Sequence, residues 1–313
     1  MIRYIIRRFA GVLAVLLLLS MFTFVLSRAI PGGPWDVGVE IPRTDEQIAM
    51  FKAKFGLDKP IWQQYLIWLR NAVMLDFGSP YMAPELSVTE LVWKQLPYSA
   101  LVGGLAAALS IVLGILLGMI AAARQNTWID VLISTCSVVI GTMPGFVLGF
   151  VLIYFFAAKL RWLPAGGWGD GAIKHLVLPV AAFGVPATGG TARWTRQCMV
   201  EAMSADYVRT AYAKGVRQAG VMSRHVLRNA LIPMITRFLP RFPAMMTGSI
   251  FIEQTFGIPG LGQWFVSSSF SRDYPMVLGI TIFWAVLISM TYFLTDILYG
   301  FIDPRVRLIE EAS

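Results

Sequence analysis

The chain has 313 residues, of which 57% are hydrophobic and 14% charged, and its mean hydropathy is +0.65. A soluble domain carries about a quarter charged residues. This composition therefore excludes an ordinary soluble protein and predicts a helical protein that crosses a membrane several times. The formal net charge of +8 could suggest a nucleic-acid-binding protein. In a membrane protein a basic balance usually reports topology instead, and we expect no nucleic-acid partner.

The first 29 residues begin with a basic cluster and continue into an apolar stretch from Phe9 to Leu26. This pattern resembles a secretory signal peptide, and the sequence SRA that follows resembles a cleavage site. The apolar stretch is longer than the core of most signal peptides, however. The sequence therefore favours a retained first membrane span, preceded by a short cytoplasmic N-terminus.

Residues 30–96 are more polar and separate the first apolar stretch from the next one. The segment TDEQIAMFKAKFGL predicts a helix capped by Thr44 or Asp45. The segment WQQYLIWLRNAV predicts a second helix, which is amphipathic. We therefore expect residues 30–96 to form a small extracytoplasmic segment.

Six apolar stretches are long enough to cross a bilayer as helices, which takes roughly 20 residues each. They cover residues 9–29, 97–123, 131–158, 173–195, 234–255 and 275–300. The second stretch is rich in glycines that would let neighbouring helices approach closely. These glycines are Gly103, Gly104, Gly114 and Gly118. The sequence thus predicts an all-α polytopic membrane protein with a core at 97–300 and a tail at 301–313.

The basic residues predict how the chain is oriented, because short cytoplasmic loops carry an excess of lysine and arginine. One set of loops is dense in such residues, which include Arg3, Arg7, Arg8, Arg124, Arg305 and Arg307. We place this set in the cytoplasm, together with both termini. Residues 30–96 and the loops 159–172 and 256–274 then lie on the other side.

The sequence shows no pattern of an enzyme. It has no phosphate-binding loop, no HExxH and no nucleophile elbow. Its cysteines, Cys136 and Cys198, and its histidines, His175 and His225, are too few and too scattered for a disulfide framework or a metal site. We expect no catalytic residue and no metal or other cofactor bound by this chain.

Two carboxylates border the predicted spans, Glu253 near the outer end of the fifth and Asp296 near the inner end of the sixth. A proton- or sodium-coupled carrier usually needs ionisable groups near mid-depth. The positions of Glu253 and Asp296 therefore argue against ion coupling. If the chain moves a solute uphill, the energy comes from another protein.

The stretch DYVRTAYAKGVRQAGVMSRHVLRNALIP, residues 206–233, lies between the fourth and fifth predicted spans. Its basic residues alternate with apolar ones, which predicts a short amphipathic helix parallel to the membrane. Two interpretations remain open. The arginines contact lipid headgroups, or the segment docks a cytoplasmic partner through an apolar face with a charged rim.

This stretch resembles the EAA loop of the inner-membrane permease subunits of binding-protein-dependent ABC importers. DYVRTAYAKG, with Pro233 18 residues after Gly215, is similar to the long form of the loop in the peptide/opine/nickel family. That register places the core of the motif at Arg209, Thr210 and Ala211; Glu201-Ala202-Met203 spells the motif at the wrong spacing. Other segments match in the same order: FGLDKPIWQQYLIWL, LDFGSPY, RQNTWID, WLPAGGW, IEQTFGIPGLGQWF, RDYPMVLG and IDPRVR. The oligopeptide-type first permease is the nearest branch.

The resemblance implies a set of partners. The chain would be one of two related permeases in a pseudo-twofold pair within a bacterial or archaeal cytoplasmic membrane. A cytoplasmic ATPase subunit would dock on each permease, and an extracytoplasmic binding protein would deliver the cargo. ATP and magnesium would be held by the ATPases. The cargo would be oligopeptides or dipeptides, with glutathione, nickel chelates and oligosaccharides as alternatives from the same family.

The resemblance also implies roles for individual residues. Residues 201–233 would form the coupling loop, with a coupling helix at 215–228 seated in a groove of the ATPase. The residues assigned to coupling are Arg209, Thr210, Ala211, Gly215, Val216, Arg217, Leu227 and Pro233. Ala211 and Gly215 would be small so that the backbones can approach closely. The segment after the fifth span would form an outer gate, or alternatively an ordinary surface loop; its residues are Glu253, Gly257, Pro259, Gly260 and Gly262.

The chain departs from the family pattern at a few positions. Tyr212 stands where the loop usually has arginine, which puts that contact in doubt. Arg237 and Arg241 are spaced to share one face of the fifth helix, in a region where the family is usually neutral. Either both side chains reach the inner headgroups, or they line the translocation path and favour cargo carboxylates. Pro240 and Pro243 predict a bend in this helix.

Two other classes of function remain as rivals. A standalone carrier or channel would transport by itself in liposomes. A structural or assembly protein would hold a cytoplasmic partner through the basic loop without transport, so that nucleotide hydrolysis would be indifferent to mutations at 209–228.

Overall fold

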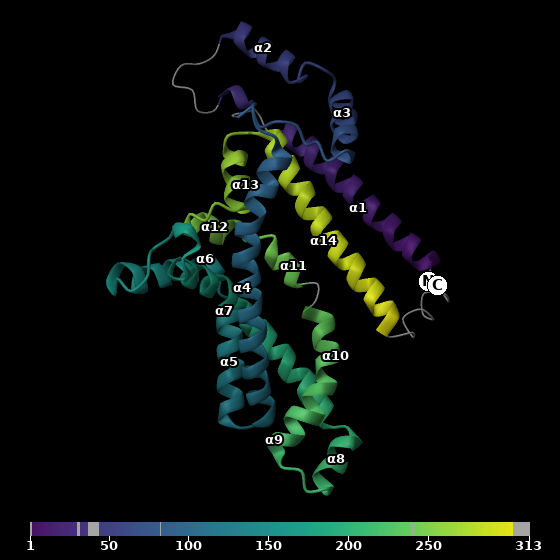
Figure 1. Ribbon diagram of the computed structural model, residues 1–313, viewed down its shortest axis with the longest axis vertical. Helices are drawn as coiled ribbons and strands as arrows, with labels where there is room; N and C mark the ends of the chain where they lie inside the picture. The colour runs from purple at the N-terminus through teal and green to yellow at the C-terminus, as the bar shows by residue number, and fades with distance from the viewer. Residues whose placement is uncertain (1, 30–31, 37–43, 82, 239–240, 303–313) are drawn as a thin grey trace. The chain divides into compact units, whose positions relative to one another are not determined.

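The computed structural model describes residues 2–29, 32–36, 44–81, 83–238 and 241–302. Every regular element among these residues is helical, as the composition predicts (Figure 1). The chain divides into two compact units, one formed by Met1–Pro97 with Pro259–Ser313 and the other by Tyr98–Ile258. Helix α4 (Val88–Ala123) contributes residues to both units.

In the first unit, α1 (Ile2–Ala29) packs along α14 (Tyr274–Ile302) (Figure 1). Arg8 Nε lies 3.2 Å from Asp296 Oδ2. The rings of Phe9 and Phe293 meet edge-on, with centroids 5.9 Å apart. Asp296 therefore has a structural role, because it ties the two long helices together.

The segment after α1 holds η1 (Pro34–Asp36), α2 (Asp45–Lys54) and α3 (Ile61–Val73). The predicted cap at Thr44 is confirmed. Thr44 Oγ1 accepts a hydrogen bond from the Gln47 backbone N–H, and Gln47 Oε1 accepts one from the Thr44 N–H, which together form a capping box. Helix α3 contacts α1, and its Tyr65 hydroxyl lies 2.9 Å from Ser20 Oγ.

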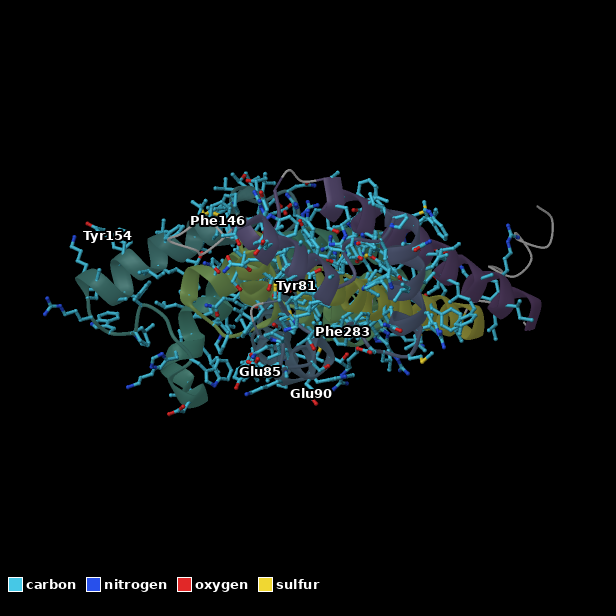
Figure 2. The ribbon with its side chains drawn as sticks, turned by 90° about the horizontal axis from the view of Figure 1, so that it is seen from above. Tyr81, Glu85, Glu90, Phe146, Tyr154 and Phe283 are labelled. Atoms are coloured by element: carbon cyan, nitrogen blue, oxygen red, sulfur yellow. The ribbon has the colours of Figure 1, made fainter. Side chains whose placement is uncertain are left out.

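A compact apolar core holds the first unit together between the start of α4, α13 (Leu261–Phe270) and α14. Its buried residues are Phe77, Val88, Leu91, Val92, Leu261, Met276, Ile280 and Ile282. Tyr81, which precedes α4, is also buried, whereas Glu85 and Glu90 are exposed (Figure 2). The apolar side chains at the start of α4 thus pack in the core of this unit, whereas the carboxylates of Glu85 and Glu90 face solvent.

In the second unit, α7 (Ile173–Met203) contacts α5 (Trp128–Thr142), α6 (Gly145–Leu152), α10 (Leu227–Phe238) and α12 (Ile250–Phe256). The remaining short elements are η2 (Ile153–Lys159), η3 (Gly169–Gly171), α8 (Asp206–Ala213), α9 (Gln218–Gly220), η4 (Val221–Val226) and α11 (Arg241–Met246).

The glycines of α4 allow α7 to approach closely, as predicted. A Cβ atom on Gly114 would lie 2.5 Å from the Thr191 Cβ, and one on Gly118 would lie 2.5 Å from the Thr195 Cβ. Gly104 differs, because the nearest atom to its added Cβ is 4.0 Å away. Two of the glycines thus mark the line along which α4 and α7 meet.

The third predicted span, 131–158, is not a straight helix. Helix α5 ends at Thr142, and the following helical segment, Gly145–Lys159, is bent from it by 97°. The cause lies at Met143, which is extended at ψ 124° because it precedes Pro144. A proline ring disfavours the helical conformation of the residue before it, so the chain turns here.

Three of the described helices are long and apolar enough to cross a bilayer: Tyr4–Ala29, Val88–Ala123 and Tyr274–Ile297. The bent pair beginning at Trp128 is a fourth if it counts as one span. The fifth predicted span, 234–255, is divided between α10, α11 and α12. Between α11 and α12 the helix is broken at Gly248, which has a φ of 92°.

Some sequence-based expectations lie outside the described residues. These are the bend at Pro240, the side chain of Arg3, the cytoplasmic arginines Arg305 and Arg307, and the segment IDPRVR and tail beyond Ile302.

Candidate functional site

The basic loop between α7 and α10 folds as a helix, a turn and a second helix. Helix α8 ends at Ala213, and the chain turns through Gly215, which has a left-handed φ of 76°. Arg217 is extended, and helical structure resumes at Gln218 and continues through η4 into α10. Of the predicted helix over 215–228, residues 218–228 are helical. Its predicted start is wrong, because the first three residues form the turn that follows α8.

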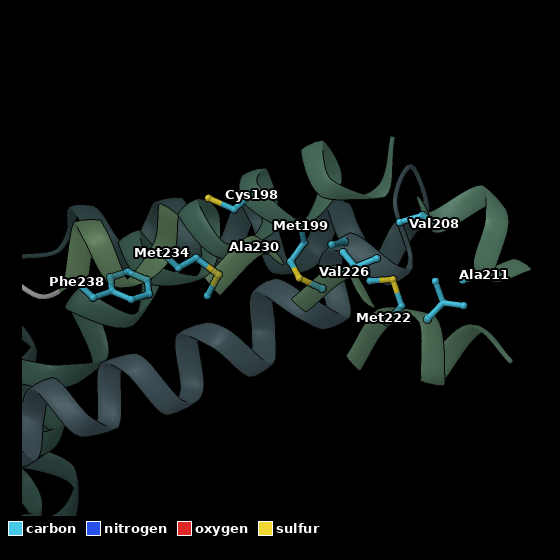
Figure 3. Packing of buried hydrophobic residues seen from close by; sticks show 11 residues of the cluster. Cys198, Met199, Val208, Ala211, Met222, Val226, Ala230, Met234 and Phe238 are labelled. Atoms are coloured by element: carbon cyan, nitrogen blue, oxygen red, sulfur yellow. The ribbon is translucent and has the colours of Figure 1, made fainter. Parts of the chain in front are cut away.

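The apolar side of this loop is buried inside the second unit. Figure 3 shows Val208 and Ala211 of α8 in one cluster with Met222 and Val226 of η4. The cluster continues onto α7 at Met199. The loop is therefore amphipathic as predicted, but its apolar face packs against the chain's own helices. It does not form a free apolar surface for insertion into lipid.

The polar side of the loop is exposed and strongly basic. All five lysines and arginines of residues 206–233 are exposed, and they are Arg209, Lys214, Arg217, Arg224 and Arg228. Arg209 lies 3.9 Å from Asp206, but both side chains are more than four-fifths exposed, so this ion pair contributes little. Tyr212 is also exposed, at 44%. The loop thus exposes cations and an aromatic ring on one side, while its other side is packed against α7.

The predicted coupling residues divide between these two sides. Arg209, Thr210, Gly215 and Arg217 are exposed, whereas Ala211 is buried in the loop's own cluster. The small side chain of Ala211 therefore serves packing within the loop. Of the other three, Val216 and Leu227 are partly buried, and Pro233 is exposed in α10.

Gly215 is required by the backbone rather than by a close contact within the chain. A Cβ atom added to it would meet no atom within 4 Å. Its φ of 76° is a conformation that residues with a Cβ atom adopt at a cost. The turn between α8 and α9 depends on this residue.

The two arginines of the fifth predicted span have different surroundings. The guanidinium Cζ of Arg237 lies 4.2 Å from the centroid of the Trp194 ring on α7. This distance is that of a cation–π interaction. Arg241 lines a cavity of about 320 Å³ with residues of α4 and α7. The structure thus fixes Arg237 against α7 and places Arg241 at a space that could hold a ligand.

The residues assigned to the outer gate lie on either side of the boundary between the two units. In the second unit, Glu253 of α12 is buried and Gly257 ends that helix with a left-handed φ of 61°. In the first unit, Pro259 is partly buried, and Gly260 and Gly262 are buried at the start of α13. Four of these five residues are thus buried or partly buried, whereas Gly257 is exposed.

An ion pair that we did not predict from the sequence joins α5 to α7. Asp130 Oδ1 and Oδ2 accept hydrogen bonds from Arg196 Nε and Nη2, at 2.5 and 2.7 Å. Asn126 N–H donates a further bond to this carboxylate. The available signal was a carboxylate at the start of one apolar stretch and an arginine just beyond another. A single sequence does not show that the two meet.

Comparison with known families decides what kind of protein carries this loop. Residues 114–308 match the family described as "Binding-protein-dependent transport system inner membrane component". Residues 1–86 match a second model, described as "Binding-prot-dependent transport system membrane comp, N-term". The chain belongs to this family. It is a membrane component of a binding-protein-dependent transport system, as the resemblance of the basic loop predicts.

Curated members of the family match this transport component over nearly their whole length. The oligopeptide transport system permease protein OppB of Haemophilus influenzae is 38% identical, over 98% of this chain and 100% of its own. The dipeptide transport system permease protein DppB of Bacillus subtilis is 38% identical, over 98% and 99%. The OppB of Escherichia coli K12 is 36% identical, over 98% and 100%.

A solved structure supports the fold of this family member. It is described as a crystal structure of an amino acid ABC transporter with histidines. The similarity has a TM-score of 0.53 at 18% identity, and covers 67% of this chain and 93% of that chain. At this level of identity the similarity concerns the arrangement of helices.

Proposed function

We propose that this chain is a permease subunit of an ATP-driven peptide importer and that its exposed basic turn docks a cytoplasmic ATPase subunit. The observation that carries the proposal is the structure of the loop. Its apolar side chains are buried against α7, so the exposed Arg209, Tyr212 and Arg217 are held in place on a packed support. Aromatic and arginine side chains on such supports are the usual anchors of protein interfaces.

The proposed assembly contains two related permeases, two ATPases and an extracytoplasmic binding protein. The full-length similarity to oligopeptide and dipeptide permeases supports peptides as the cargo. ATP and magnesium bind in the ATPases, and this chain performs no catalysis. It crosses a bacterial or archaeal cytoplasmic membrane six times, with both termini inside; the fourth and fifth crossings are made by α7 and by α10 to α12.

Coupling in this proposal works through rigid bodies. Closure of the ATPases around ATP moves α8 and the Gly215 turn. This movement is passed on to α7, because Val208 of α8 and Met222 of η4 share one buried cluster with Met199 of α7. Helix α7 also contacts α5, α6, α10 and α12, so the second unit rocks as a body between inward- and outward-facing states. The residues Glu253, Gly257, Pro259, Gly260 and Gly262 form part of the outer gate.

The test is uptake by the complete transporter reconstituted in proteoliposomes with its binding protein. Arg209→Glu should reduce peptide uptake and binding-protein-stimulated ATP hydrolysis by at least about tenfold, since it reverses a charge at the docked surface. Lys54→Glu is the matched control: it reverses an exposed charge on α2 and should leave both rates unchanged. Equal rates for both variants would overturn the docking surface.

The rival functions make different predictions in the same preparation. A standalone carrier would take up peptide from liposomes that contain this chain without the ATPases. An assembly protein would leave ATP hydrolysis insensitive to Arg209→Glu. Either result would replace the proposed function.

A further inference from the structure

The cavity beside Arg241 is distinct from the docking turn and lies wholly within the second unit. It measures about 320 Å³ and is lined by α4, α7, α10 and α11. Its lining residues are Ala107, Ser110, Ile111, Phe183, Ala187, Thr191, Phe238, Arg241, Ala244 and Met245. Apolar side chains with a few convergent polar groups are the usual lining of a small-ligand site, and this volume falls within the range of such sites.

The cavity lies well inside the ends of α4 and α7. Ser110 precedes Ala123, the last residue of α4, by thirteen residues, which is about 20 Å along the helix axis. Thr191 precedes Met203, the last residue of α7, by twelve residues, or about 18 Å. The cavity is therefore more than three helical turns from these ends and away from the loops that follow them.

Arg241 supplies the charge of this cavity. It is the single charged residue among the described residues that line it. The hydroxyl oxygens of Ser110 and Thr191 lie 3.0 Å apart on the facing helices. Thr191 Oγ1 also donates to the Ala187 carbonyl, so the protons of both hydroxyls are engaged within the chain and Arg241 is the free donor among the described residues of this lining. An ionisable side chain in a membrane protein that faces a cavity marks a substrate pathway, and an arginine binds a carboxylate through paired hydrogen bonds.

Arg237 does not share this role. Its guanidinium is packed on the Trp194 ring, and it is absent from the residues that line the cavity. The two arginines are four residues apart on the chain, yet Arg237 packs on the Trp194 ring and Arg241 lines the cavity. Arg237 therefore provides a matched control for Arg241.

We propose that Arg241 binds the C-terminal carboxylate of the cargo peptide as it passes through the cavity. This inference rests on the proposed function, because it assumes that peptides cross along α4 and α7. It makes Arg241 a determinant of specificity for carboxylate-bearing cargo.

The test compares uptake of a tripeptide with uptake of the same tripeptide amidated at its C-terminus. Both are measured in proteoliposomes that hold the complete transporter, with saturating binding protein outside. Wild type should transport the free acid faster, and Arg241→Gln should reduce the ratio of acid to amide uptake on the order of tenfold. Arg241→Lys should retain part of the ratio, because it keeps the charge and loses the paired geometry. Arg237→Gln should retain the wild-type ratio.

The ratio isolates the permease, because the binding protein is the same in every sample and its own preference cancels. An unchanged ratio in Arg241→Gln overturns the inference, as does a loss that is equal for the two peptides. Stimulated ATP hydrolysis, recorded in parallel, reports on the proposed function: if it persists while the ratio is unchanged, only the role of Arg241 fails.

Discussion

The ion pair between Asp130 and Arg196 offers a quantitative test of how the second unit is held together. Asp130 has 5% of its side chain exposed and accepts two hydrogen bonds from Arg196, which has 29% exposed. Removing one member of a buried pair costs about 3–5 kcal/mol, because the other charge is left uncompensated. Since Arg196 is partly exposed, we expect Asp130→Ala to lower the free energy of unfolding by about 3 kcal/mol, at the low end of that range.

The assay is thermal unfolding of the purified transporter in detergent, followed through this subunit. A loss of about 3 kcal/mol corresponds to an apparent Tm lower by roughly 5–8 °C for a chain of this size. The double variant Asp130→Ala with Arg196→Ala should recover much of that loss, because no buried charge remains unpaired.

A neighbouring arginine provides the control for this experiment. Arg193 is exposed on α7, one turn before Arg196, and Arg193→Ala should leave the apparent Tm unchanged. If Asp130→Ala and Arg193→Ala gave the same Tm, or if the double variant were no more stable than Asp130→Ala, the pair would not be the tie between α5 and α7 that the geometry implies.

The helix contact, the buried tyrosine and the loop turn each give a further prediction. Gly114→Ala should lower the apparent Tm by a few degrees, because its Cβ would lie 2.5 Å from the Thr191 Cβ; Gly104→Ala, with its nearest atom at 4.0 Å, should not. Burial raises the pKa of Tyr81 from 10.0 to about 12, so its contribution to stability is complete below pH 10 and declines as the pH rises from 10 to 12. Tyr81→Phe should remove this component of the decline in Tm measured between pH 10 and 12. Gly215→Ala should reduce stimulated ATP hydrolysis, because a left-handed φ costs an alanine about 1 kcal/mol, and Gly215→Asn should reduce it less; equal rates for the two variants would contradict this reasoning.

Features encoded locally could be predicted from the sequence. The apolar runs of α1, α4 and α14 exceed what any soluble helix needs, so their existence follows from composition. The cap at Thr44 follows from a short pattern whose two hydrogen bonds join neighbouring residues. The close approach at Gly114 also follows from residue type, since a small side chain in an apolar helix has few other uses.

Features that depend on the partner of a residue could not be predicted in this way. Pro144 is visible in the sequence, but whether it bends a span or ends one depends on the helices around it. The sequence predicts a loop helix that begins at Gly215, whereas the left-handed conformation of Gly215 makes it part of a turn. Arg237 and Arg241 look equivalent in sequence, and only the position of the Trp194 ring separates their roles.

The most direct test of the central claim is photo-crosslinking from position 212 in native membranes. A photoreactive amino acid replaces Tyr212, which lies in the last turn of α8 and is 44% exposed. The crosslinked chains are identified by mass spectrometry. The same amino acid at Trp62, which is 62% exposed on α3, serves as the control. Our account predicts a crosslink from position 212, and none from position 62, to a subunit that carries a phosphate-binding loop. Crosslinks from position 212 to lipid alone, in membranes where the transporter is active, would contradict it.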